Sequence, residues 1–166
     1  MTTAMLFLAA ALAAAPAEEP CAKLYDALAK LHHTPQRHSS TLHPEGDGPD
    51  GTTEYVQTED RQYVKFPFAQ SWSSTPLGEA DRAAMDAGLN AITAPAEGRV
   101  CNATGEETLG GEPAHVFVIR DEHARSDTRY WVSVKTGLLV KRFTALSHGA
   151  SLTDTYAYDD VKAPAP

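Results

Sequence analysis

The chain has few of the features that mark an enzyme or a membrane-embedded protein. It has only two cysteines, and neither has a CxxC or CxxH companion, which speaks against a zinc site built on them. No serine lies in a Gly-x-Ser-x-Gly turn, so the strained nucleophile turn of the α/β hydrolases is absent. No apolar run reaches the roughly 20 residues that a permanent membrane-spanning helix needs. The sequence therefore favours a soluble, non-catalytic protein.

Basic residues are also scarce. Lysine and arginine number 14 against 22 aspartate and glutamate residues, giving a formal net charge of −8. So acidic a chain is a poor candidate for binding nucleic acid or an anionic membrane surface. Its size is that of one domain with a single hydrophobic core.

The first residues are typical of an export signal. A short apolar run, Met5–Leu12, is followed by small residues, and Ala15 and Ala17 fit the small-x-small rule for signal peptidase. We therefore expect a signal peptide over residues 1–17 and a working domain over 18–166. The alternative is a disordered alanine-rich tail. The high alanine and proline content favours a bacterial origin, hence a periplasmic or secreted protein.

The two cysteines, Cys21 and Cys101, are expected to pair in such an oxidising compartment. The bond would close a loop of about 80 residues, worth on the order of 4 kcal/mol in the chain-entropy model. Two free buried thiols are the alternative. Lipidation of Cys21 is not expected, because Glu18, Glu19 and Pro20 precede it where small residues are required.

The apolar periodicity predicts an α+β fold with one antiparallel sheet of about seven strands, covered on its apolar face by two helices. Helices are expected over 19–31 and 76–92, and a polar extended stretch over 36–43. The predicted strands cover 52–58, 61–68, 100–109, 112–121, 130–134, 138–146 and 151–161.

Hairpin register predicts which side chains share the apolar face. With Gly110-Gly111 as a two-residue turn, Ala103 opposes Val118, which places Cys101, Ala103, Val116 and Val118 together. In the next hairpin the shared face carries Tyr130, Val132, Val134, Leu138 and Val140. A first helix on that face brings Cys21 over Cys101.

Three segments carry a resemblance to a known family. Glu107–Phe117, with its Gly-x-x-Ala turn, the strand and turn Tyr130–Arg142 with Lys-Thr-Gly-Leu, and the closing strand Tyr156–Pro164 follow one another as in outer-membrane lipoprotein carrier-like proteins. The resemblance implies a curved half-barrel, covered by helices, that holds an apolar ligand on its concave face. A Cys21–Cys101 bond between helix and sheet is a departure that opposes opening.

The resulting hypothesis is a non-catalytic periplasmic binding protein for a lipid or other apolar ligand, without cofactor or metal. The partner is a lipid or acyl chain, or else an envelope protein; no nucleic acid and no stable membrane anchor are expected. The alternative is a structural or protein-interaction domain whose interior its own side chains fill. The predicted ligand-binding residues are Phe66, Trp72, Val116, Val118, Tyr130, Val132, Val134, Leu138 and Val140.

Histidines are the remaining candidates for chemistry. His32, His33, His38 and His43 fall close together and invite a zinc or copper interpretation. A helix end and a strand separate them, and His38 and His43 lie on opposite faces of an extended stretch. Solvated surface histidines are therefore the favoured interpretation.

Overall fold

The structure is a computed structural model that describes residues 19–124 and 126–165. The predicted signal peptide, residues 1–17, lies outside the described residues.

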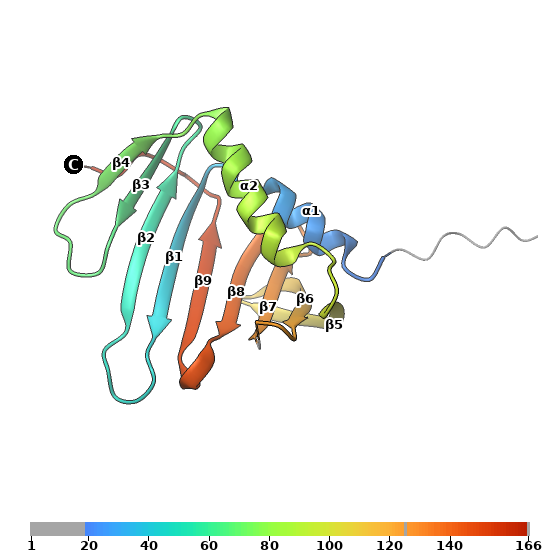
Figure 1. Ribbon diagram of the computed structural model, residues 1–166. Coiled ribbons are helices and arrows are strands. Elements are labelled where there is room, and N and C mark those ends of the chain that lie inside the picture. The colour runs from blue at the N-terminus through green and yellow to red at the C-terminus, as the bar shows by residue number, and fades with distance from the viewer. Residues whose placement is uncertain (1–18, 125, 166) are drawn as a thin grey trace, which may run out of the picture.

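Two helices lie on the same face of one sheet (Figure 1). The helices are α1 (Ala22–Leu31) and α2 (Glu79–Thr93), with a single 3-10 turn, η1 (Ser147–Gly149), near the end of the chain. The strands are β1 (Gln36–His43), β2 (Gly51–Gln57), β3 (Arg61–Lys65), β4 (Ser73–Pro76), β5 (Arg99–Leu109), β6 (Glu112–Asp121), β7 (Ser126–Ser133), β8 (Leu139–Ala145) and β9 (Ser151–Ala157).

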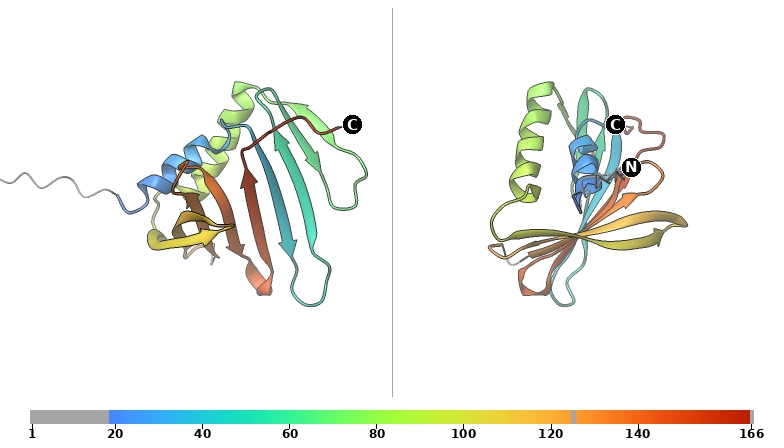
Figure 2. Two further views of the ribbon diagram at one scale, coloured as in Figure 1. Left: turned by 180° about the vertical axis from the view of Figure 1, so that it is seen from behind. Right: turned by 90° about the vertical axis from the view of Figure 1, so that its right-hand side faces the viewer.

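The sheet is antiparallel, with strand order β4-β3-β2-β1-β9-β8-β7-β6-β5. Its first and last strands in the chain, β1 and β9, are neighbours at the centre. The sheet twists so strongly that the β5–β6 hairpin runs across the direction of β1 and β2 (Figure 2). The predicted α+β class and the single antiparallel sheet with two helices are confirmed.

The predicted strand number is wrong by two. The polar stretch over 36–43 is a full strand, β1, and Ser73–Pro76, for which no strand was predicted, forms β4 against β3. Neither segment shows the apolar alternation expected of a half-buried strand. Pro76 is tolerated because β4 is an edge strand, where a missing backbone N–H breaks no ladder.

Helix α1 forms because its apolar residues recur at helical spacing, and it buries that stripe on the sheet. Leu24, Ala27, Leu28 and Leu31 are buried against β6, β7 and β8. Cys21, at the start of the helix, is bonded to Cys101 on β5. The predicted disulfide is therefore confirmed, and α1 is tied to the edge of the sheet.

A β-bulge in β5 decides which side chains of β6 face α1. Thr104 is an extra residue opposite β6, so Ala103 pairs with Phe117 and not with Val118. Gly105, which has a φ of +128°, follows directly, and such a conformation favours glycine. The predicted pairing of Ala103 with Val118 is wrong by one residue.

One residue of slip moves a strand's side chains to the other face of the sheet. Phe117 and Ile119 pack beneath α1, whereas Val116 belongs to a separate cluster on the face away from the helices. We call the face of the sheet that α1 and α2 cover the helix face, and the opposite face the far face. A second bulge, at Val140, likewise places that residue on the far face, while its neighbour Leu139 faces α1.

After β9 the chain crosses the far face of the sheet toward β3 and β4 (Figure 2). The Arg37 guanidinium on β1 donates to the Asp159 carbonyl at 3.0 Å and holds the start of this segment. Within residues 19–124 and 126–165, no helix is long and apolar enough to cross a membrane.

Removing the disulfide should destabilise the fold without changing it. Cys21 and Cys101 are 80 residues apart in the sequence, so the double variant Cys21→Ala/Cys101→Ala should lose about 4 kcal/mol of unfolding free energy in urea. Thiol titration of the denatured, non-reduced wild type should find no free sulfhydryl. Two free thiols would contradict the placement of α1.

Candidate ligand-binding cleft

The predicted binding residues do not form one site. Tyr130 and Val132 do lie on the helix face, but α1 covers them, leaving 3% and 1% of each exposed. Leu24, Leu28 and Leu139 complete this core beneath α1. The apolar end of the helix face is therefore filled by the protein's own side chains.

Three predicted residues lie on the far face. Val116 packs with Ala114 and Trp131, with Val140 partly buried against them, and Val118 lines an adjoining hollow. Their expected position beneath the helices is wrong for the register reason given above. The Trp131 indole N–H donates to the Glu107 carboxylate at 2.7 Å, so the polar group of this small far-face cluster has a hydrogen-bond partner.

The other four predicted residues lie at the periphery. Phe66 is 58% exposed just after β3 and lies outside the core beneath α1. Trp72 lines a far-face hollow of about 530 Å³ with the carboxy-terminal segment. Val134 is exposed beyond the end of β7, and Leu138 lines a hollow near the β7–β8 turn.

A cleft remains where the helix face is polar. It has a volume of about 320 Å³ and lies between α2 and strands β1, β2 and β9. Its sheet side consists of amide, aromatic and basic side chains: Gln36, His38, Tyr55, Gln57, Gln62, Arg142 and Tyr156. Its helix side is largely apolar and is formed by Leu31, His32, Met85, Leu89 and Ile92. We refer to this space as the polar cleft.

An aromatic ladder forms the floor of the polar cleft. The His38 ring is stacked between Tyr55 and Tyr156, with ring centroids 4.8 Å and 4.5 Å away. The three rings adjoin because His38 pairs with Tyr55 on β2 and with Tyr156 on β9. Burial raises the pKa of the Tyr156 hydroxyl above its ordinary range, so this tyrosine stays neutral.

A buried carboxylate holds the polar side chains of the floor in place. Asp154 is fully buried; one oxygen lies 2.8 Å from His38 Nε2, and the other accepts from Arg142 Nε at 2.7 Å. Burial alone raises the pKa of Asp154, but the hydrogen bond from His38 and the attraction and hydrogen bond of Arg142 outweigh it and lower the pKa to about 2. Asp154 is therefore ionised and both its oxygens are occupied, which makes it an anchor and not a free base.

Two glutamine amides join the floor to the end of α1. Gln36 Nε2 donates to the Leu31 carbonyl and Gln57 Nε2 to the His32 carbonyl, each at 2.8 Å. These carbonyls belong to the last turn of α1, where the helix itself supplies no donors. Gln36 Oε1, however, is buried without a hydrogen-bond partner among the described residues.

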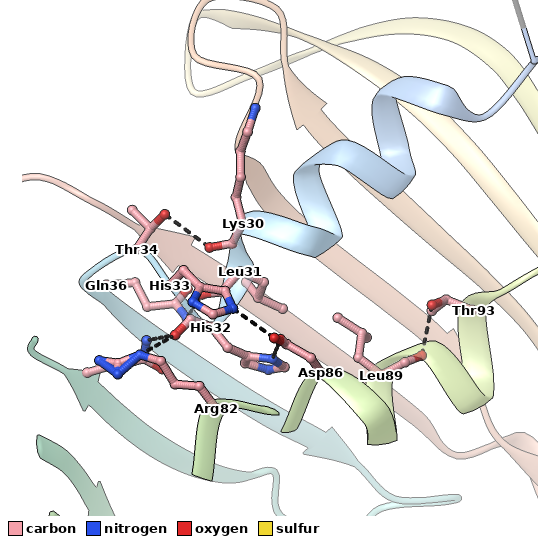
Figure 3. Close-up of polar contacts among 11 residues, drawn as sticks. Lys30, Leu31, His32, His33, Thr34, Gln36, Arg82, Asp86, Leu89 and Thr93 are labelled. Carbon is pink, nitrogen blue, oxygen red and sulfur yellow. Dashed lines mark hydrogen bonds and ion pairs between the residues drawn. The ribbon is translucent and has the colours of Figure 1, made fainter. Parts of the chain in front are cut away.

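Helix α2 is held over the cleft mainly by polar contacts (Figure 3). Its Asp86 carboxylate lies 2.9 Å from His32 Nδ1 and 2.7 Å from His33 Nε2. Burial raises the pKa of Asp86, but the hydrogen bonds from His33 and His32 outweigh that effect and lower it. Arg82 adds a bond to the His32 carbonyl at 3.0 Å. We call the contacts of Asp86 with His32 and His33 the histidine clamp.

Apolar packing contributes little to α2. Only Leu89 and Thr93 of this helix are buried, and Ile92 is 56% exposed although it lines the cleft. By contrast, α1 has four buried residues and a disulfide. The helix that borders the cleft is therefore the more weakly anchored of the two.

The sequence interpretation missed the residues that form this site. It treated the histidines as solvated, yet His38 is stacked and hydrogen bonded, and His32 and His33 tether α2. The alternation of Gln36, His38 and Ser40 in an extended stretch was the available signal, since it places three polar side chains on one face. Among the described residues, no group of three or more His, Cys, Asp or Glu side chains is arranged to hold a metal ion.

No protein-family model matches the sequence, and no curated protein matches it. Solved structures do match in shape. MucB matches with a TM-score of 0.57 at 15% identity, over 89% of this chain and 62% of MucB. LppX, a lipoprotein of Mycobacterium tuberculosis, matches with a TM-score of 0.50 at 14% identity, over 86% of this chain and 94% of LppX.

This chain has the fold of MucB and LppX. The predicted resemblance to lipoprotein carrier-like proteins is confirmed at the level of fold. A complex of MucA with MucB from Pseudomonas aeruginosa also matches, with a TM-score of 0.55 at 14% identity over 84% of this chain and 59% of that one. The chain spans about three fifths of the length of MucB.

The Asp154 anchor should make stability fall in acid. Because its folded pKa of about 2 lies below the ordinary value of 3.8, its contribution is present above about pH 4 and is lost as the pH falls through 2. The free energy of unfolding, measured in urea, should fall by about 2 kcal/mol between pH 5 and pH 2.

Asp154→Asn should be less stable than wild type at pH 6 but decline less in acid. Asp26→Asn, which alters only an exposed pair with Lys30, serves as the control and should change stability by less than about 0.5 kcal/mol. If the free energy of unfolding fell equally in acid for Asp154→Asn and for the wild type, the Asp154 carboxylate would not be the cause of the fall.

Breaking the histidine clamp should loosen α2 alone. We expect Asp86→Ala to speed amide hydrogen exchange in Glu79–Thr93 roughly tenfold, because the helix has few apolar contacts to replace the lost bonds. Exchange in β7, beneath α1, should not change, and neither should that of α2 in the control Asp26→Ala. Unaltered exchange of α2 in Asp86→Ala would contradict the clamp.

Proposed function

We propose that this chain is a non-catalytic binding protein of the cell envelope whose partner is another protein. The observation that carries the proposal is the filled apolar end of the helix face. Tyr130 and Val132, the residues expected to line an acyl cavity, are buried beneath α1, and the disulfide opposes the displacement of that helix.

The chemistry of the remaining space supports the same proposal. An acyl chain is best held by an apolar pocket with few polar groups. The sheet side of the polar cleft instead presents amides, Arg142 and His38, which offer hydrogen bonds that a hydrocarbon chain cannot use. The shared fold with MucB, which has been seen in complex with MucA, is consistent with a protein partner.

Binding of a lipid or another apolar ligand is the second candidate. The apolar wall of α2, with Met85 and the half-exposed Ile92, favours it. A half-buried acyl chain could lie along that wall without entering the filled core.

Native mass spectrometry of the protein from its own envelope separates the two candidates. We expect the free chain without a lipid adduct and, after gentle cross-linking, a complex with one protein of defined mass and stoichiometry. A co-purified lipid, with no protein complex, would overturn the proposal in favour of the lipid carrier.

A fluorescent fatty-acid probe provides the second arm of the test. We expect no saturable binding to the wild type. Two substitutions on opposite faces of β7 serve as matched controls: Val132→Ala changes the helix face, and Trp131→Ala changes the far face. Probe binding that is altered by Val132→Ala but not by Trp131→Ala would establish the helix face as a lipid site.

A further inference from the structure

We infer that the polar cleft binds a carboxylate that carries a short apolar group, and that the guanidinium of Arg142 receives this carboxylate. The inference rests on the proposed protein partner, which supplies such a group as its carboxy-terminal residue or as an acidic side chain beside an apolar one.

Arg142 has hydrogen-bond donors that the protein itself does not use. A guanidinium carries five N–H groups, and Arg142 Nε donates one of them to Asp154 at 2.7 Å. Among residues 19–124 and 126–165, Nη1 and Nη2 have no hydrogen-bond partner, yet neither is a fully buried atom. The side chain is 21% exposed and lines the polar cleft. The unused donors are therefore accessible from the cleft.

Asp154 holds the guanidinium in place from beneath the floor. Its side chain is only 1% exposed, and its two oxygens are already occupied by Arg142 Nε and His38 Nε2. The contact through Nε leaves the edge formed by Nη1 and Nη2, whose parallel N–H groups match the two oxygens of a carboxylate. An acceptor for this edge comes from the cleft and not from Asp154.

The lining of the polar cleft is poor in acid for so acidic a chain. None of its described lining residues is aspartate or glutamate, although the chain has 22 of them. Three of the lining side chains, His32, His38 and Arg142, carry basic nitrogens. Asp86 of α2 is engaged by His32 and His33. An anion therefore enters the cleft without meeting an unpaired carboxylate.

The shape of the cleft selects the kind of anion. Met85 and Ile92 of α2 offer an apolar surface within the same space of about 320 Å³, which is at the small end of ligand pockets. A carboxylate attached to a compact apolar group uses both walls. Phosphate uses only the guanidinium, and its second charge has no further arginine or lysine in the lining to pair with.

The sequence provides three NMR reporters for the test. Residues 18–166 contain one methionine, Met85, and two isoleucines, Ile92 and Ile119. Met85 and Ile92 line the cleft, whereas Ile119 lies in the core beneath α1. The disulfide-bonded mature protein with ¹³C-labelled methionine and isoleucine methyl groups therefore gives two signals from the site and one from a control position.

The first comparison uses two ligands on the wild-type protein. We expect N-acetyl-L-leucine to shift the Met85 and Ile92 methyl signals saturably and to leave Ile119 unchanged. Its uncharged primary amide, which has the same shape, should bind about tenfold more weakly, the typical effect of hydrogen bonds to a charged group. Inorganic phosphate should bind more weakly than N-acetyl-L-leucine.

The second comparison uses two conservative substitutions. Arg142→Lys keeps a cation for Asp154 but removes the paired Nη groups, and we expect it to weaken N-acetyl-L-leucine binding at least fivefold. Arg120→Lys is the matched control, because Arg120 also bonds an aspartate, Asp127, through Nε but does not line the cleft. It should change binding by less than twofold. If Arg142→Lys does not fold, the comparison of acid and amide on the wild type decides alone.

Fatty acids of two lengths identify the source of the carboxylate. Each methylene group that is newly buried should tighten binding about fourfold. Because the apolar end of the helix face is filled, we expect dodecanoate to bind no more than about fivefold more tightly than hexanoate. An affinity that rises a hundredfold or more with chain length would assign the carboxylate to a fatty acid and overturn its assignment to a protein partner.

Equal binding of N-acetyl-L-leucine and its amide, or unaltered binding to folded Arg142→Lys, would overturn the inference, as would tighter binding of phosphate. If any of these results came with a defined protein complex from the envelope, the proposed function would stand and only the assignment of the cleft would fail. If N-acetyl-L-leucine binds as expected but the envelope protein carries only lipid, the carboxylate site stands and the proposed function fails.

Discussion

The anchoring of α1 is the constraint on which the arrangement of the helix face depends. Its leucine stripe packs on β6, β7 and β8, the Cys21–Cys101 bond fixes its start, and the amides of Gln36 and Gln57 fix its end. With both ends held, α1 cannot tilt away from the sheet without breaking covalent or buried polar contacts. The apolar end of the helix face is therefore filled by the leucines of α1 and the side chains beneath them.

The division of the sheet follows from the sequence of its strands. β6 and β7 contribute Phe117, Ile119, Tyr130 and Val132 beneath α1, whereas β1 contributes Gln36 and His38 beside α2. Burial of polar side chains is costly unless they are hydrogen bonded, which explains why Asp154 is surrounded by donors. Among residues 19–124 and 126–165, Gln36 Oε1 is the exception, since it is buried without a hydrogen-bond partner.

The sequence was sufficient to predict the features that depend on periodicity and on cysteine pairing. The stripe of α1, the fold class and the disulfide were all predictable for this reason. Strand register was not predictable. The bulges at Thr104 and Val140 each insert one residue into a strand, and no local sequence pattern indicates either insertion. Those two residues moved Val116, Val118 and Val140 to the far face. The polar cleft was missed because its residues meet only through the pairing of β1 with β2 and β9, which are distant along the chain.

The central position of β1 has a consequence for how the chain can fold while it is being synthesised. The amino-terminal half forms the strands β4-β3-β2-β1 and the carboxy-terminal half forms β9-β8-β7-β6-β5, and the two halves join through the pairing of Arg37 with Ala157 and their neighbours. A chain that emerges from its amino terminus exposes the edge of β1 until its last strand arrives. The polar composition of β1 then protects the unfinished sheet, since a polar edge is a poor template for aggregation.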